Sequence, residues 1–135
     1  MKIVNSFFLN DLLGPLVGLG DVDPIVEQYA DFDSNDEVSV RGVIRELIVP
    51  HAQTLTDRNR ALISVAYRYY LTTNSTDFKQ EFEAILPPLD PPDDARLFYL
   101  WTWEECFPGE SYLLPDADEY RVKHDPDETW QIHLT

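Results

Sequence analysis

Apolar residues recur at helical spacing through most of the chain. The clearest helix spans 57–73, where Leu62, Val65, Ala66, Tyr69 and Tyr70 form one face and Thr56 or Asp57 opens the helix. Similar stripes predict further helices: from Phe8 to a stop or kink at Gly14-Pro15, from a cap at Asp23, from after Asp33-Ser34-Asn35 to Pro50, from a cap at Ser75 or Thr76 to Pro87, and from Asp93-Asp94 to Pro108. A short strand over 3–8 is the alternative at the N-terminal end. The pattern predicts a mainly α fold of about five to six helices in a single compact domain, residues 1–135.

The period changes near the C-terminal end of the sequence. Residues 120–124 and 129–134 both alternate apolar and polar side chains, and residues 125–128 between them have turn chemistry. This pattern predicts a small C-terminal β-hairpin. Because an isolated hairpin is only marginally stable in water, we expect it to pack on the helices or to pair with residues 2–6.

The charged residues are unevenly distributed along the chain. The 135 residues carry 25 Asp and Glu against 10 Lys and Arg, a formal net charge of −15. Residues 41–89 are almost neutral, whereas 1–40 and 90–135 are strongly acidic. A hydrophobic content of 44% with 13% aromatic residues argues against acidic disorder. Such a surface repels nucleic-acid phosphates and anionic lipid, so we expect neither as a direct partner.

Cysteine usage and hydropathy indicate the compartment. Cys106 is the single cysteine, which excludes an intramolecular disulfide and is typical of a reducing environment. The sequence has no uncharged apolar run of the roughly 18 residues that would span a bilayer. We therefore expect a cytoplasmic protein.

No residue pattern in the sequence indicates catalysis, a metal site or a cofactor. The stretch 31–36 begins like a calcium loop, but Asp36 stands where that loop needs Gly and Gly42 where it needs Glu. His51, His124 and His133 lack the partner spacing of metal sites, and Cys106 lies beside acids that oppose a thiolate. The sequence favours a protein that is not an enzyme. A small enzyme using His124, His133 and an acid of the tail is the third-ranked alternative.

The acidic C-terminal third is the candidate binding surface. It interleaves carboxylates with aromatic side chains, which combines electrostatic steering with the anchors typical of protein interfaces. The candidate contact residues are Glu104, Glu105, Glu110, Tyr112, Asp116, Asp118, Glu119, Tyr120, Asp125, Asp127 and Glu128. Should this segment not be the contact, residues 21–37 are the next acidic candidate.

A resemblance to a known family lies in the size of the chain, its acidity and stretches such as Trp103-Glu-Glu-Cys-Phe-Pro-Gly-Glu110. In these features the chain resembles the immunity proteins of bacterial toxin–immunity pairs, including those of contact-dependent growth inhibition. The resemblance implies a cytosolic inhibitor that binds a cognate basic toxin, expected to be a nuclease, at its active site or an adjacent exosite. These proteins share no single fold, so the resemblance implies no architecture and no oligomeric state. The main alternative is a DNA mimic of the anti-restriction type, whose carboxylates imitate a phosphate backbone.

Overall fold

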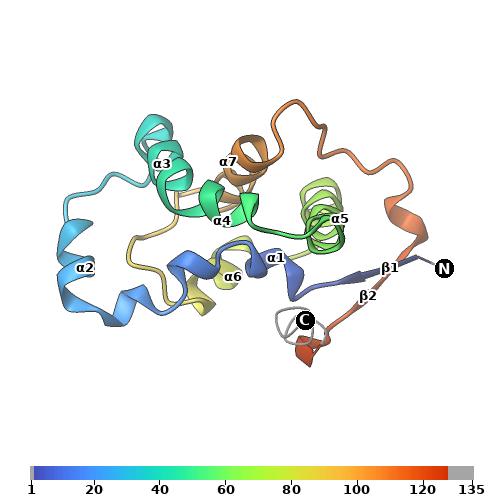
Figure 1. Ribbon diagram of the computed structural model, residues 1–135, viewed down its shortest axis with the longest axis horizontal. Helices are drawn as coiled ribbons and strands as arrows, with labels where there is room; N and C mark the ends of the chain where they lie inside the picture. Colours follow the sequence, from blue (N-terminus) through green and yellow to red (C-terminus); the bar gives the residue numbers. More distant parts are fainter. Residues whose placement is uncertain (1, 128–135) are drawn as a thin grey trace.

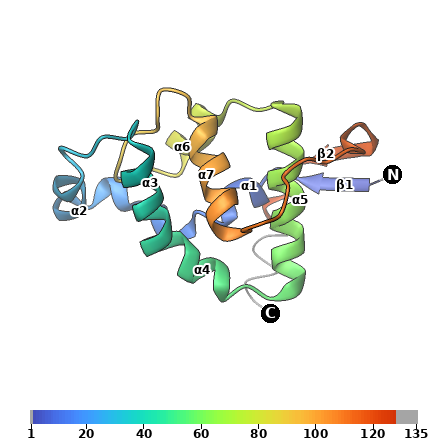
Figure 2. The same cartoon turned by 90° about the horizontal axis from the view of Figure 1, so that it is seen from above.

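Helices make up most of the structure, a computed structural model that describes residues 2–127 (Figure 1). The helices are α1 (Phe8–Asp11), α2 (Asp23–Gln28), α3 (Glu37–Val43), α4 (Val49–Gln53), α5 (Asp57–Thr73), α6 (Phe78–Ala84) and α7 (Arg96–Cys106), and the strands are β1 (Lys2–Asn5) and β2 (Tyr120–Lys123). The mainly α prediction is confirmed. Two views show α2 at one end of the molecule and the two strands at the other, with α5 beside the strands (Figures 1 and 2).

The two strands correct the hairpin prediction. β2 pairs with β1 in parallel, with Lys2 opposite Tyr120 and Asn5 opposite Lys123. The segment 120–123 therefore pairs with the N-terminal strand, as the alternative pairing with residues 2–6 anticipated, whereas 129–134 lies outside the described residues. Val4 of β1 is buried in the hydrophobic core and β1 contacts α5, so the strand pair packs on the helices.

α5 confirms its predicted bounds and corrects its predicted face. The Thr56 hydroxyl accepts the Asn59 N–H at 3.2 Å, and Asn74 ends the helix in the left-handed conformation. Its buried residues are Ile63, Ala66, Tyr67, Tyr70 and Leu71, whereas Leu62, Val65 and Tyr69 of the predicted face are only partly buried. The helix contacts both α7 and β1, so apolar side chains are needed on more than one side of it.

The helix predicted to stop at Pro50 continues past it. A π-helical segment, Ile44–Ile48, follows α3, and α4 then begins with Pro50 in its first turn. Proline is tolerated there because the first N–H groups of a helix have no partner within it. The wider π turn thus separates one predicted helix into two, and Ile44 and Ile48 on it are fully buried.

Three other helix starts differ from those predicted by one to three residues. Val22, not Asp23, is the residue before α2, and Asp23 lies in its first turn, where a carboxylate favours the helix dipole. Asp77 caps α6 in place of Ser75 or Thr76 and accepts the Gln80 N–H at 3.1 Å. α7 begins at Arg96 rather than at Asp93 or Asp94, and the Arg96 N–H donates a hydrogen bond of 3.2 Å to the Asp94 carboxylate.

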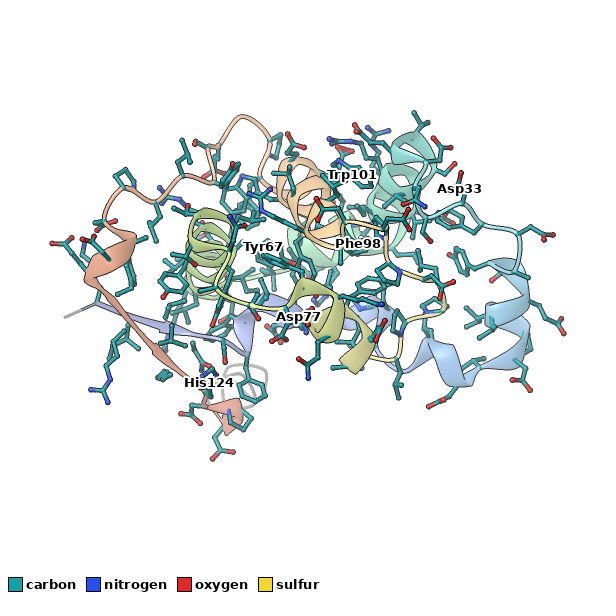
Figure 3. The ribbon with its side chains drawn as sticks, turned by 180° about the vertical axis from the view of Figure 1, so that it is seen from behind. Asp33, Tyr67, Asp77, Phe98, Trp101 and His124 are labelled. Carbon is teal, nitrogen blue, oxygen red and sulfur yellow. The ribbon has the colours of Figure 1, made fainter. Side chains whose placement is uncertain are left out.

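The core is one cluster of aromatic and aliphatic side chains from α1, α3, α4, α5, α6 and α7 and from the π-helical segment. Trp103 stacks on Phe107 with ring centroids 4.4 Å apart, and Phe82 meets Phe98 at 4.7 Å. Tyr67 and Phe98 lie between the helices (Figure 3). α2, in contrast, contributes no fully buried residue and lies at the margin of this core.

Candidate acidic binding surface

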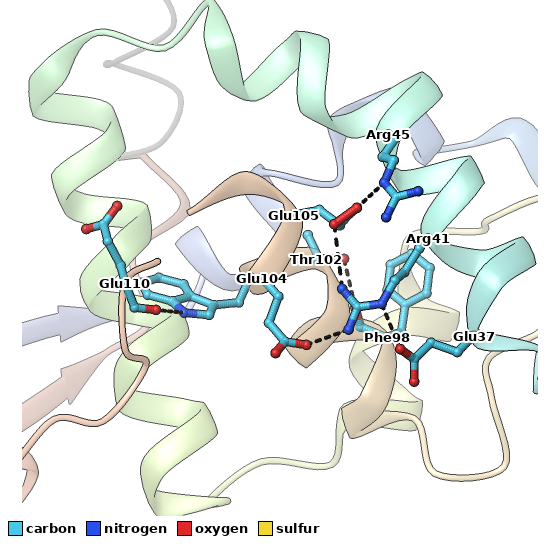
Figure 4. Close-up of polar contacts among 9 residues, drawn as sticks. Glu37, Arg41, Arg45, Phe98, Thr102, Glu104, Glu105 and Glu110 are labelled. Carbon is cyan, nitrogen blue, oxygen red and sulfur yellow. Dashed lines mark hydrogen bonds and ion pairs between the residues drawn. The ribbon is translucent and has the colours of Figure 1, made fainter. Parts of the chain in front are cut away.

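Glu104 and Glu105, near the end of α7, are neutralised by arginines of the neighbouring helix (Figure 4). Arg41 of α3 donates to Glu104 at 2.7 Å and lies 3.6 Å from Glu105, which Arg45 also binds. Glu37 accepts from Arg41 at 2.9 Å. Burial opposes the charge of Arg41, but hydrogen bonds to Glu104 and Glu37 outweigh it and raise the guanidinium pKa. These two predicted contact residues therefore have their charge balanced within the protein, where they tie α3 to α7.

Glu110 and Tyr112 hold the segment after α7 against the helices. The Glu110 carbonyl accepts the Trp103 indole N–H at 2.9 Å, and its carboxylate lies 3.8 Å from Arg60. The Arg96 guanidinium lies over the Tyr112 ring, 5.5 Å from its centroid. Both predicted contact residues thus interact with cations of the same chain.

Asp116, Glu119 and Tyr120 gather around Lys2 at the strand end of the molecule. The Lys2 ammonium binds Asp116 and lies 3.9 Å from Glu119 and 5.7 Å from the Tyr120 ring centroid. The hydrogen bond from Lys2 lowers the pKa of Asp116, and the same bond raises the pKa of Lys2. Tyr120 also packs on Tyr69, with ring centroids 6.2 Å apart. Lys2 therefore balances one of the two carboxylates and leaves the other uncompensated.

Asp118, Asp125 and Asp127 are the predicted contact carboxylates that form no ion pair within residues 2–127. Asp118 precedes β2 and the other two follow it, so the strand separates them. Asp125 is held through its backbone by Asn5, whose amide donates to the Asp125 carbonyl at 2.8 Å. Glu128 lies outside the described residues. The structure does not gather the predicted contacts into one continuous unbalanced patch.

A denser set of unbalanced carboxylates lies at the opposite end of the molecule. We call this the α2 end and define it as residues 17–36 together with 80–95, two segments that contain no Lys or Arg. Two backbone hydrogen bonds of 2.8 Å join them, from the N–H groups of Gly18 and Gly20 to the carbonyls of Ile85 and Leu86. Figure 3 shows Asp33 at this end and His124 at the other.

The carboxylates of the α2 end have few cations near them. Glu83 has Lys79 at 3.9 Å. The acids here that form no ion pair within the described part of the chain are Asp21, Asp23, Glu27, Asp31, Asp33, Asp36, Glu81, Asp90, Asp93 and Asp94. The sequence signal for this surface is the absence of cations from both segments. Their contact in space has no signal in the sequence.

The cysteine and the histidines that are candidates for catalysis are Cys106, His124 and His133. Burial raises the pKa of the Cys106 thiol to about 12, as expected for a structural cysteine. His124 Nδ1 shares a hydrogen bond with the Ser6 hydroxyl, and His133 lies outside the described residues. Among residues 2–127, no three His, Cys, Asp or Glu side chains come together as metal ligands would.

Comparison with known proteins adds no relative: no family model, no curated protein and no solved structure matches the chain. None of the helices within residues 2–127 combines the length and the hydrophobicity that crossing a membrane requires.

Proposed function

We propose that this protein is a cytosolic inhibitor of the immunity type, which binds a basic toxin with nuclease activity and neutralises it. The observation that supports the proposal is the α2 end, where two cation-free segments lie together and leave their carboxylates unpaired. Like charges gathered in this way destabilise the folded state through mutual repulsion. A basic partner removes that repulsion when it binds.

A nuclease has the complementary surface because its active-site cleft is cationic in order to hold phosphates. Opposite fields accelerate encounter and can raise association rate constants to 10⁸–10⁹ M⁻¹s⁻¹ at low salt. Fast capture suits an inhibitor that must reach its toxin before the toxin reaches nucleic acid. The α2 end is the primary contact in this proposal, and Asp118, Asp125 and Asp127 contribute a weaker field from the other end.

The arrangement of the carboxylates favours an inhibitor over a DNA mimic. A mimic of one DNA strand needs negative charges about 7 Å apart along an elongated surface. Here the unpaired carboxylates are most numerous at one end, and some of the acids between the two ends, such as Glu104 and Glu105, are bound by arginines.

The test begins with the genes that flank this protein's gene, one of which should encode a basic nuclease toxin if the proposal holds. The absence of such a gene would count against the proposal, and where one is found its purified product is the partner used. We expect a 1:1 complex, loss of nuclease activity at equimolar inhibitor, and an association rate constant that falls steeply between 50 and 500 mM NaCl, a range over which the Debye length shrinks from roughly 14 to 4 Å. Failure of the equimolar protein to inhibit the toxin would overturn the proposal.

Two variants that each remove two charges locate the contact. Asp21→Asn with Asp90→Asn alters the α2 end, and Asp125→Asn with Asp127→Asn is the matched control at the strand end. The first pair is expected to slow association several-fold more than the second. Equal effects would show that total charge rather than the α2 end directs binding.

A further inference from the structure

We propose that a groove at the α2 end receives an extended basic segment of the protein partner, with an apolar side chain of that segment packed on Leu86. The inference rests on the proposed function, because it names the part of the partner that this surface recognises. The groove, called the Leu86 groove below, is formed by Gly20, Asp21, Glu83, Leu86, Pro87, Leu89, Asp90 and Pro91 and has a volume of about 300 Å³.

The groove continues into a second hollow. This hollow, about 330 Å³, shares Glu83, Asp90 and Pro91 with the first and is also lined by Lys79, Pro92 and Asp93. Because they share three lining residues, the two hollows adjoin and form one open channel along the loop that joins α6 to α7.

Leu86 supplies an apolar anchor in this channel. Its side chain is 52% exposed, and its backbone has a φ of +54°, in the left-handed region. That conformation costs a residue with a branched side chain about 1 kcal/mol or more, and Gly or Asn would adopt it more easily. Val17 is also exposed, and the hydrogen bond from the Gly18 N–H to the Ile85 carbonyl brings its segment beside that of Leu86.

The groove is held in shape before any partner binds. A Cβ added to Gly20 would lie 2.7 Å from the Pro87 carbonyl oxygen and 2.9 Å from that of Leu86, so the two backbones are in direct contact. Prolines restrict the opposite wall. A preorganised site loses little conformational entropy on binding, which favours affinity for a short segment.

Charge and backbone chemistry define the segment. Asp21 and Asp90 line the groove without an ion pair in the described part of the chain, whereas Glu83 already faces Lys79. Arg or Lys side chains on either side of an apolar residue would therefore pair with the two aspartates. Because Pro87 and Pro91 have no N–H to donate, this wall cannot pair as a β-strand. Recognition therefore depends on the side chains of the partner, an apolar one flanked by cations.

The experiment titrates the complete, ¹⁵N- and methyl-labelled protein with a synthetic Gly-Arg-Leu-Arg-Gly peptide, capped at both ends, and follows the spectrum by NMR. We expect concentration-dependent shifts of the Leu86 methyl groups and the Gly20 amide at millimolar peptide. Peptides with Leu replaced by Gly, or both Arg by Gln, should bind at least five-fold more weakly. Shifts centred on the strand end, or no shifts at all, would overturn the inference.

A variant with a matched control tests the anchor. Leu86→Asn keeps a residue that tolerates the left-handed conformation, so the fold is retained, and it should weaken peptide binding at least five-fold. Leu113→Asn removes an equally exposed leucine, 56% against 52%, from the segment after α7 and should leave binding unchanged. Equal effects of the two variants would contradict a specific groove. The peptide assay needs no toxin, so the groove and the inhibitor function can fail independently.

Discussion

Replacement of Arg41 by Met tests whether the arginine–glutamate cluster between α3 and α7 is structural. The change retains most of the apolar stem and removes the guanidinium from three carboxylates. The pair with Glu37 is an exposed i,i+4 pair, for which about 0.4 kcal/mol is typical, and the pair with half-exposed Glu104 contributes up to about 1 kcal/mol. Glu105, 13% exposed, loses one of its two cations. We expect the free energy of unfolding to fall by about 1.5–2 kcal/mol.

Urea denaturation followed by tryptophan fluorescence measures this loss, because Trp101 and Trp103 lie in the buried part of α7. Arg45→Met is the matched control: Arg45 is 63% exposed and has one carboxylate partner, so about 0.5 kcal/mol is expected. The loss for Arg41→Met should shrink at 1 M NaCl, where the Debye length is only about 3 Å. Equal losses for the two variants, or a loss below about 0.5 kcal/mol for Arg41→Met, would refute the structural role.

Two further predictions concern the backbone contact at the α2 end and the alkaline limit of stability. Gly20→Ala should lower the free energy of unfolding by about 2 kcal/mol or more, since its Cβ would lie 2.7 Å from the Pro87 carbonyl oxygen. Gly42→Ala is the control, because Gly42 lies on α3 with open space around it, and it should raise the free energy of unfolding by about 0.5–1 kcal/mol in the same urea assay. Burial raises the pKa values of Cys106 and Tyr70 to about 12, above their unfolded values of about 9 and 10, so the folded state holds these protons longer. Their contribution to stability is complete below pH 9 and should be lost as the pH rises toward 12, and urea midpoints that stay constant from pH 8.5 to 11 would contradict this.

Local rules explain which parts of the fold the sequence predicts. α5 has a cap at Thr56 and a long apolar pattern, so its bounds follow from neighbouring residues alone. The prediction that the helix stops at Pro50 is wrong because proline is disfavoured inside a helix but tolerated in its first turn. The π turn before Pro50 contains the buried residues Ile44 and Ile48, and their burial is a property of the folded chain. The parallel strand pair is harder to predict because no turn links β1 to β2, and the sequence indicates residues 2–6 only as one possible partner of 120–123.

The candidate surface shows the same limit. The acidity of residues 90–135 is plain in the sequence, but the arginine that balances Glu104 lies 63 residues away in it, and only the fold brings the two together. The contact between residues 18–20 and 85–86 likewise requires the folded backbone. Net charge is therefore readable from composition, whereas the location of unpaired charge is a tertiary property.

The parallel pairing of β1 with β2 also constrains how the chain folds. Ser6 and His124, which meet just beyond the paired strands, are 118 residues apart in sequence, so closing this contact carries a large loop entropy that helix formation does not. During synthesis β1 emerges long before its partner strand exists, and one edge of β1 remains unpaired until β2 follows. We therefore expect the helices to assemble first and the strands to join last, which makes strand closure the slow and aggregation-sensitive step of folding.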